Sequence, residues 1–435
     1  MWRSVFRALY LAYFILGIIL CFIPAGAQAE SGDVVVLTVK GNIVPVVADY
    51  ISRGITEAEQ RGSTACIIEL DTPGGLLDTT EKIVQSIMNA KVPVIVYVSP
   101  HGAWAASAGT FITVSAHMSA MAPATSIGAA HPVSVGEQVP EAVTKKATEY
   151  SAAWIQSIAE KRGRDPALVE AAVKESKSFT ANQALDSKLV DFVADDLDAL
   201  MSKLDGRTVT LADGRQVTIR TQGAAITRSG MTGAENFLHM ISHPNVAYIL
   251  LTLASIGLIT EISNPGLIFP GVIGGICLFL AFYSLGVLNA SWAGILLILL
   301  AIGLFVSEIF VGAHGILTTG GIISFVIGSM ILFSESEASM QVDIWLIVVV
   351  VFLLAAFVAF LVWATIRGQR RKVTTGREGM IGQIALVKSA LAPRGKVLVE
   401  GELWTAELEE GTAQPGEEVV IRKIENLKLL VSRNK

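Results

Sequence analysis

Short apolar stretches alternate with amphipathic ones over the first two hundred residues. The stretches at 34–39, 65–70 and 93–98 are almost wholly apolar, whereas apolar residues recur every three to four positions at 45–62 and 79–90. Buried strands separated by helices are typical of a mostly parallel α/β sheet with crossover helices. We therefore expect this fold class for residues 30–200.

The alternation continues toward the end of this domain. Beyond it, Asp213-Gly214 separates two short alternating stretches, and Asp-Gly is a strong hairpin signal. Residues 201–242 are therefore predicted to form a hairpin and a linker. Within the domain we expect a helix after Ser107, a short strand near 117–121, a long helix over 141–163, and a strand at 189–193 among further helices.

Apolar stretches of membrane-spanning length dominate residues 243–367. A helix needs about 20 apolar residues to cross a bilayer, and Gly and Pro are tolerated inside such helices. The break at Asn264-Pro265 leaves open a re-entrant pair in place of the first two crossings. We expect about five helices, at 246–262, 267–288, 291–311, 315–333 and 343–366.

The ends of the apolar segments predict the orientation. Residues 1–29 combine Arg3 and Arg7 with an apolar run and a final Ala27-Gln28-Ala29, which is typical of a cleaved signal peptide; an uncleaved anchor is the alternative. Either way the next domain is exported. The last apolar stretch follows acidic residues and precedes basic ones at 367–372, as the positive-inside rule requires of a cytoplasmic end. We expect a multi-pass protein of a bacterial-type cytoplasmic membrane, in contact with lipid.

Residues 376–435 change to short alternating strands with turn residues between them. Sixty residues of this kind predict a small closed barrel of the OB type, on the cytoplasmic side. Such barrels often bind oligonucleotides through aromatic and basic side chains. Trp404 is the only aromatic residue of this segment. We therefore expect a protein contact or a structural cap here.

Composition agrees with a membrane protein and excludes several other classes. Hydrophobic residues make up 52% of the 435 residues, and the net charge of −5 gives no general attraction to nucleic acid. The three cysteines, Cys21, Cys66 and Cys277, form no C-x-x-C pair, and the six histidines form no H-E-x-x-H motif. We expect no nucleic-acid partner, no metal and no cofactor.

Small residues are concentrated between Asp71 and Pro132, in the segments DTPGG, AWAASAGT and APATSIGAAHP. Ser107 follows a short loop and opens a helix, where backbone N–H groups favour developing negative charge. It is a candidate nucleophile, and an ordinary N-cap is the alternative. Gly74 and Gly75 allow a backbone N–H to face a carbonyl oxygen, although a tight turn would also use them.

A serine nucleophile needs a base, and His117, His131, Lys145 and Lys146 are the candidates. The periodicity of the helix that begins at Glu141 distinguishes between the two lysines as candidates. Its apolar face is predicted to contain Val143, Ala147, Tyr150, Trp154 and Ile158. Lys146 borders this face, whereas Lys145 lies on the wet side. Partial burial disfavours a charged ammonium, which suits Lys146 to the role of a base.

Together these motifs resemble the NfeD family of membrane-bound serine proteases, which are relatives of the Clp proteases with a crotonase-like fold. The resemblance runs from about residue 33 to the end. It implies Ser107 as nucleophile and Lys146, followed four positions later by Tyr150, as general base. It also implies an oxyanion site formed by Gly74 and Gly75, with the amide of Ala108 as a second donor.

The Clp relatives instead use a histidine beside a proline, and His131-Pro132 lies near that position. Aligning the prolines places Ala130 at the catalytic position, one residue away, which reverses the side chain's face in a strand. Ser107 with His131, and an acid such as Asp186 or Asp191, is therefore the alternative to the dyad of Ser107 and Lys146.

The resemblance further implies a substrate and partners. The substrates would be apolar segments of membrane-associated proteins, and the partners would be stomatin-like proteins of the band-7 class. The chain itself would form a homo-oligomer of at least two copies. The inferred role is membrane protein quality control. A non-proteolytic scaffold for band-7 proteins is the alternative. A crotonase-type acyl-CoA enzyme is disfavoured, because an exported domain lies in a compartment without CoA.

Overall fold

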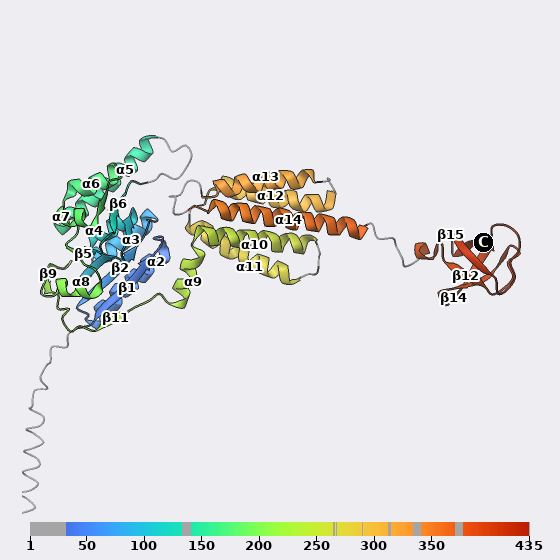
Figure 1. Ribbon diagram of the computed structural model, residues 1–435, viewed down its shortest axis with the longest axis horizontal. Coiled ribbons are helices and arrows are strands. Elements are labelled where there is room, and N and C mark those ends of the chain that lie inside the picture. Colours follow the sequence, from blue (N-terminus) through green and yellow to red (C-terminus); the bar gives the residue numbers. More distant parts are fainter. Residues whose placement is uncertain are drawn as a thin grey trace, which may run out of the picture. The chain divides into compact units, whose positions relative to one another are not determined.

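The N-terminal domain is built on a parallel sheet of six strands (Figure 1). This computed structural model describes residues 32–132, 141–263, 266, 268–288, 290–311, 315–333, 341–369 and 377–434. The predicted signal peptide therefore lies outside the described residues. In sheet order the strands are β11 (Ile226–Arg228), β1 (Val34–Lys40), β2 (Ala65–Asp71), β3 (Val94–Val98), β5 (Met118–Met121) and β8 (Phe192–Val193).

Both faces of the sheet are covered, which explains why its central strands are apolar throughout. One face packs on α2 (Pro45–Arg61), α3 (Leu77–Met88) and α4 (Ala108–Ser115). The other packs on α8 (Leu197–Leu204) and on the hairpin of β9 (Thr208–Thr210) and β10 (Gln216–Thr218). All five residues of β3 are buried, as the sequence predicted for a central strand.

A second, smaller sheet supports the candidate site. Its order is β4 (Trp104–Ala106), β6 (Ser126–Gly128) and β7 (Ser178–Thr180). Isolated bridges join Thr72 to Ala105 and Ile43 to Gly75, so the loops that follow β1 and β2 extend this layer. Three further helices complete the domain: α5 (Glu141–Arg162), α6 (Pro166–Lys174) and α7 (Ala181–Asp186).

The segment predicted as hairpin and linker contains more structure than expected. Strand β11 returns to the sheet and pairs in parallel with β1, in the register Val35↔Thr227. Helix α9 (Gly233–Ile241) follows and begins with a capping box between Thr232 and Glu235. The chain therefore remains part of the N-terminal domain well beyond the predicted hairpin.

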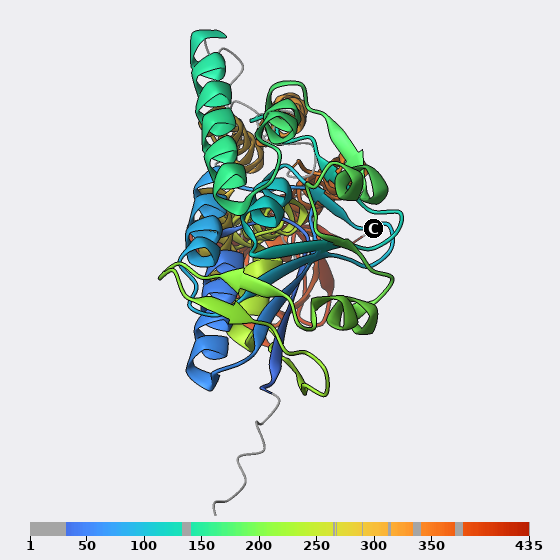
Figure 2. The ribbon, with the colours of Figure 1, turned by 90° about the vertical axis from the view of Figure 1, so that its left-hand side faces the viewer.

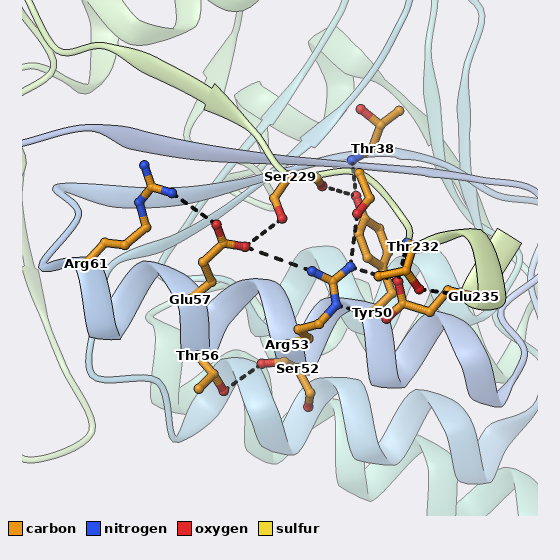
Figure 3. Close-up of polar contacts among 11 residues, drawn as sticks. Thr38, Tyr50, Ser52, Arg53, Thr56, Glu57, Arg61, Ser229, Thr232 and Glu235 are labelled. Atoms are coloured by element: carbon orange, nitrogen blue, oxygen red, sulfur yellow. Dashed lines mark hydrogen bonds and ion pairs between the residues drawn. The ribbon is translucent and has the colours of Figure 1, made fainter.

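Polar contacts fasten α9 and the segment before it to α2 (Figure 3). The guanidinium of Arg53 binds both carboxylate oxygens of Glu235, at 2.9 and 2.8 Å, and donates to the carbonyl of Gly230 at 2.9 Å. Tyr50 Oη donates to the carbonyl of Ser229 at 2.7 Å. At its other end α9 meets the next part of the chain, because Ser284 Oγ donates to the carbonyl of Ile241.

Five apolar helices follow, as predicted (Figure 1). By length and composition three of them, in the described part of the chain, can cross a membrane: Pro244–Ser263, Ile268–Val287 and Ile344–Leu361. These belong to α10 (Pro244–Ser263), α11 (Ile268–Val287) and α14 (Ile344–Gln369). The other two are α12 (Trp292–Val311) and α13 (Ile316–Ile331). The Asn264-Pro265 break, on which the re-entrant alternative depends, lies outside the described residues.

Glycines shape the first of the two helical hairpins of this region, and a buried carboxylate shapes the second. A Cβ on Gly257 of α10 would lie 2.8 Å from the Cα of Gly274 on α11, so the two backbones touch. In the second hairpin, Glu308 of α12 is 2% exposed and accepts the N–H groups of Gly315 and Thr318, at 2.7 and 3.0 Å. Its carboxylate therefore caps the start of α13.

The last described segment folds into the predicted closed barrel. Its strand order is β12 (Ile384–Val387), β13 (Arg394–Val399), β14 (Glu402–Leu408), β16 (Lys428–Arg433) and β15 (Glu418–Glu425). Alternate residues of each strand form a small apolar core, as the sequence pattern predicted. Trp404 packs against that core.

Candidate active site

Ser107 occupies the N-cap position of α4, in a backbone conformation that side chains rarely adopt. Its φ is 49° and its ψ is −113°, and its side chain makes no capping hydrogen bond. An ordinary N-cap has extended backbone and a side-chain oxygen bonded to the first turn. Ser107 meets neither condition, so the structure disfavours the N-cap alternative. Strained residues of this kind are concentrated at functional sites.

The glycine pair lies in a loop whose one edge is hydrogen-bonded to Ile43. Ile43 N–H donates to the carbonyl of Gly74, and Leu76 N–H donates to the carbonyl of Ile43, each at 2.9 Å. A Cβ on Gly75 would lie 2.3 Å from the carbonyl oxygen of Ile43, so only glycine fits there. Gly74 has a φ of 138°. The backbone conformation at position 74 and the close contact at position 75 therefore both require glycine.

The two glycine amides are not equivalent. Gly74 N–H donates to Thr72 Oγ1 at 3.1 Å, and this hydroxyl donates to the Gly74 carbonyl at 3.0 Å. Gly75 N–H finds no acceptor among the described residues, as an oxyanion donor requires. Ala108 begins α4, and the first N–H groups of a helix have no partner within it. The amides of Gly75 and Ala108 are thus the better candidates for the oxyanion donors.

Thr72 joins this loop to the strand that leads to Ser107. Its N–H donates to the carbonyl of Trp104 at 2.7 Å, and its carbonyl accepts Ala106 N–H at 3.1 Å. Thr72 is fully buried. The candidate oxyanion loop and the candidate nucleophile therefore share one hydrogen-bonded framework.

Helix α5 runs parallel to α4. This direction brings Lys146 of α5 toward the N-terminal end of α4. Trp154 stacks on Phe111, with ring centroids 4.8 Å apart, and Arg162 Nε donates to the carbonyl of Ser115 at 2.8 Å. Lys146 precedes Trp154 by about two turns, or about 12 Å along the helix axis. That direction leads toward the end of α4 that carries Ser107.

The expected partial burial of Lys146 is wrong. Lys145 and Lys146 are both exposed, and so are Val143 at 52% and Tyr150 at 55%. The predicted apolar face packs only in its second half, where Trp154 and Ile158 meet the core. Figure 2 shows the reason, since the first turns of α5, the long teal helix, stand clear of the sheet.

His131 is engaged with α6. Its Nδ1 donates to the carbonyl of Val173 at 2.9 Å. In the described ranges it makes no hydrogen bond or ion pair with Asp186 or Asp191. Asp186 is exposed, and Asp191 accepts the N–H of Ser119 at 2.7 Å. The acid that would orient His131 in a triad is therefore not in place.

His117 lies at the opposite end of α4 from Ser107. Its Nδ1 accepts the N–H of Val94 at 3.2 Å. Burial lowers the pKa of His117 to about 3, and Arg162 contributes in the same direction. This half-buried histidine is held in the neutral form and is no candidate for the base.

Two buried polar residues that no sequence pattern indicates support α4. Arg164 is 5% exposed and donates to the carbonyls of Val114 and Leu189, at 3.0 and 2.6 Å. Its partner is Asp191, 3.3 Å away. Thr110, in the first turn of α4, is also buried and contacts two strands through its hydroxyl. Neither had a sequence signal, because an arginine and a threonine of this kind usually lie on the surface.

Comparisons with known proteins cover nearly the whole chain. Residues 33–209 match the N-terminal domain of NfeD1b, residues 245–364 the NfeD integral membrane domain, and residues 377–433 the NfeD-like C-terminal, partner-binding domain. A membrane-bound protease of Pyrococcus horikoshii is 38% identical over 430 residues, which are 96% of this chain and 97% of the relative. The chain belongs to the NfeD family. Membrane protein NfeD1b of Bacillus subtilis is 27% identical over 98% of both chains.

Solved structures match the N-terminal domain of this NfeD protein. A serine-to-alanine variant of a membrane-bound stomatin-specific protease is 38% identical, over 46% of this chain and 99% of that one, with a TM-score of 0.44. A lysine-to-alanine variant of that protease, in complex with a substrate peptide, is 37% identical over 48% and 98%, with a TM-score of 0.46. ClpP1 from Listeria monocytogenes is 21% identical over 38% and 94%, with a TM-score of 0.32.

Family membership confirms several predictions made from the sequence. This NfeD protein is a membrane protein and a peptide-bond hydrolase of the serine endopeptidase class. Its architecture of an α/β domain built on a parallel sheet, a helical membrane region and a small closed barrel is also confirmed.

Proposed function

We propose that Ser107 and Lys146 form the catalytic dyad of this NfeD protease. The observation that carries the proposal is the conformation of Ser107, which stands at the start of α4 with a positive φ and beside the hydrogen-bonded loop of Gly74 and Gly75. A strained turn before a helix is the arrangement that exposes a nucleophile next to backbone N–H donors.

In the proposed reaction, the amine of Lys146 accepts the proton of Ser107 Oγ while this oxygen attacks the scissile carbonyl carbon. The N–H groups of Gly75 and Ala108 stabilise the oxyanion. Lys146 then returns the proton to the leaving amine as the peptide bond breaks. Water hydrolyses the acyl-enzyme in the same manner, with Lys146 again as the base.

Exposure of Lys146 is relevant to when this reaction can occur. Water stabilises a charged ammonium, and a lysine base must be neutral. A bound apolar peptide, or a second copy of the chain, would exclude water from the first turns of α5. The proposal therefore includes apolar segments of membrane-associated proteins as substrates, and a homo-oligomer of at least two copies.

The matching test uses the two neighbouring lysines of α5. Ser107→Ala and Lys146→Ala are expected to abolish cleavage of apolar peptides, whereas Lys145→Ala keeps it, since both lysines are exposed but only Lys146 is assigned as base. Circular dichroism checks that each variant folds. Full activity of Lys146→Ala, or equal losses in both lysine variants, would refute the dyad. His131→Ala tests the alternative base.

A scaffold function is the second candidate, favoured by one observation. The barrel matches a family domain described as partner-binding. Stomatin-like proteins of the band-7 class are the proposed partners. A fluorophosphonate probe separates the two functions: labelling that is lost in Ser107→Ala supports the protease, and retained partner binding without any labelling supports the scaffold.

The proposed orientation places the protease domain outside the cytoplasm and the barrel inside. Basic residues after the last apolar stretch support it. Single cysteines placed at exposed sites of each domain, such as Ser202 and Thr412, would be labelled by an impermeant reagent from opposite sides of the membrane. Labelling of both from one side would contradict the orientation.

A further inference from the structure

The hydroxyl of Thr110 lies among three backbone groups next to Ser107. Thr110 is 2% exposed. Its Oγ1 is 2.9 Å from the carbonyl oxygens of both Ala105 and Gly128, and it accepts the N–H of Gly128 at 3.1 Å. A threonine hydroxyl has one proton and two lone pairs. The two carbonyls therefore share its proton, and the hydroxyl joins α4 to both β4 and β6.

Gly128 connects this hydroxyl to the nucleophile. The carbonyl of Gly128 accepts the N–H of Ser107 at 3.0 Å. On its other side Gly128 is pressed against the start of β7, since a Cβ there would lie 2.2 Å from the carbonyl oxygen of Lys177 and 2.6 Å from the Cα of Ser178. Gly128 is thus fixed between Lys177 and Thr110, and it holds Ser107 through one hydrogen bond.

Ser107 depends on such support. Its φ of 49° and ψ of −113° lie in a region that a residue with a side chain occupies only where its surroundings impose it. The two peptide groups of Ser107 are both fixed. Its N–H is bound by Gly128, and its carbonyl accepts the N–H of Thr110 at 3.0 Å. Thr110 therefore acts on the serine from both sides, by its backbone directly and by its hydroxyl through Gly128.

We propose that Thr110 is a positioning residue of the protease, whose hydroxyl fixes Gly128 and thereby aims Ser107 Oγ at the scissile carbonyl. This inference rests on the proposed role of Ser107 as nucleophile. Without the hydroxyl, the hydrogen bonds that join Ala105 of β4 and Gly128 of β6 to α4 would be lost, and β6 would shift relative to α4. A displacement of about 1 Å in a reacting group can cost about a hundredfold in rate.

Thr113 provides a matched control on the same helix. It is fully buried, and its Oγ1 donates to the carbonyl of Gly109 within α4 at 2.7 Å. Thr110→Val and Thr113→Val make the same change of shape and each remove one buried hydroxyl. Only the first breaks a connection between α4 and the strands that hold Ser107.

The experiment measures kcat and KM for an apolar peptide with the full-length protein in detergent, together with its thermal unfolding. Thr110→Val is expected to lower kcat about 10- to 100-fold with KM within about threefold, and Thr110→Ser to restore kcat. Thr113→Val is expected to keep kcat within about threefold. Equal losses of kcat in the two valine variants would overturn the inference, as would an unchanged kcat in Thr110→Val.

Two further measurements keep the outcome decisive. If Thr110→Val does not fold, Thr110→Cys and Thr113→Cys replace the valine pair, because a thiol is a weak donor of similar size. Fluorophosphonate labelling of the wild type separates this inference from the function it rests on. If the wild type is labelled at Ser107 and the Thr110 and Thr113 variants have equal kcat, the role of Thr110 is refuted while the proposed role of Ser107 stands. Absence of Ser107-dependent labelling and cleavage in the wild type refutes both.

Discussion

The N–H of Ser107 donates to the carbonyl of Gly128 at 3.0 Å, so the candidate nucleophile on α4 is held by a strand that comes later in the chain. Gly128 is in turn held between Thr110 and Lys177. The serine's geometry is thus a property of three elements, α4, β6 and β7. Substitutions in any of these elements are expected to alter the position of Ser107.

Relief of strain at Ser107 is expected to stabilise the protein while abolishing its activity. Alanine keeps the cost of a positive φ, about 1–3 kcal/mol. Glycine removes this cost and adds an entropic one of about 0.5–1 kcal/mol. Thermal unfolding of the full-length variants should therefore show Ser107→Gly to be more stable than Ser107→Ala by up to about 2 kcal/mol.

Ser86 on α3 gives the control for this comparison. It lies inside a helix, where glycine is less favourable than alanine by about 1 kcal/mol. Ser86→Gly should therefore unfold at a lower temperature than Ser86→Ala, the reverse of the order at Ser107. The same order at both positions would argue against strain at Ser107.

Gly75→Ala is expected to lower kcat about a hundredfold or more, because its Cβ would meet the carbonyl oxygen of Ile43 at 2.3 Å and displace the loop. Gly102 offers a control with positive φ, 82°, and no atom within 4 Å of an added Cβ. Gly102→Ala should keep kcat within a few-fold in the same peptide assay. A kcat for Gly75→Ala near that of Gly102→Ala would rule out the role of this loop.

The attachment of α9 is expected to weaken in acid. Its hydrogen bonds with Arg53 hold the pKa of Glu235 below its ordinary value of 4.5. A carboxyl whose pKa is lowered by folding stabilises the folded state above its unfolded pKa, and this contribution is lost as the pH falls below 4.5 toward the folded pKa. Hydrogen exchange of the α9 amides should therefore show less protection at pH 4 than at pH 7.

Glu235→Gln is the control for that prediction. The amide keeps the shape of the side chain but has no charge, so protection of α9 should be reduced at both pH values and should no longer fall between them. An unchanged pH dependence in this variant would assign the effect to another group.

Glu308→Gln is expected to destabilise the hairpin of α12 and α13. Glutamine has one acceptor oxygen for the two N–H groups of Gly315 and Thr318, and charged hydrogen bonds contribute about 1.5–3 kcal/mol each. In the first hairpin, Glu261 Oε2 is buried with no partner in the described part of the chain. Glu261→Gln removes no hydrogen bond of Oε2 to the described residues and is therefore not expected to lower thermal stability in detergent. Equal effects of the two substitutions would contradict the capping role.

Strong local signals made most of the architecture predictable. Strands such as β3 are buried on both faces and read as continuous apolar runs, and the membrane helices differ from them by length alone. The glycines of DTPGG and the serine of ASAGT were found for the same kind of reason. Glycine at a close backbone contact and a serine before a helix leave a direct mark in the sequence.

The remaining features depend on contacts between distant segments. Strands β4, β6, β7 and β11 have three residues each, too few for a period to appear. The apolar periodicity of α5 extends into its first turns, but these turns do not pack on the domain. Periodicity therefore predicted partial burial for Lys146, which is in fact exposed. The role of Thr110 depends on Gly128, and no local pattern links the two.

The loop of Gly74 and Gly75 has one hydrogen-bonded edge, toward Ile43, and no side chains of its own. Any peptide that extends along its other edge would present only its main chain there, and every amino acid offers the same main-chain groups. The loop would thus accept many sequences equally well. Discrimination among cleavage sites would then come from the exposed apolar side chains nearby, Trp104 of β4 and Leu77 of α3, rather than from the machinery that breaks the bond.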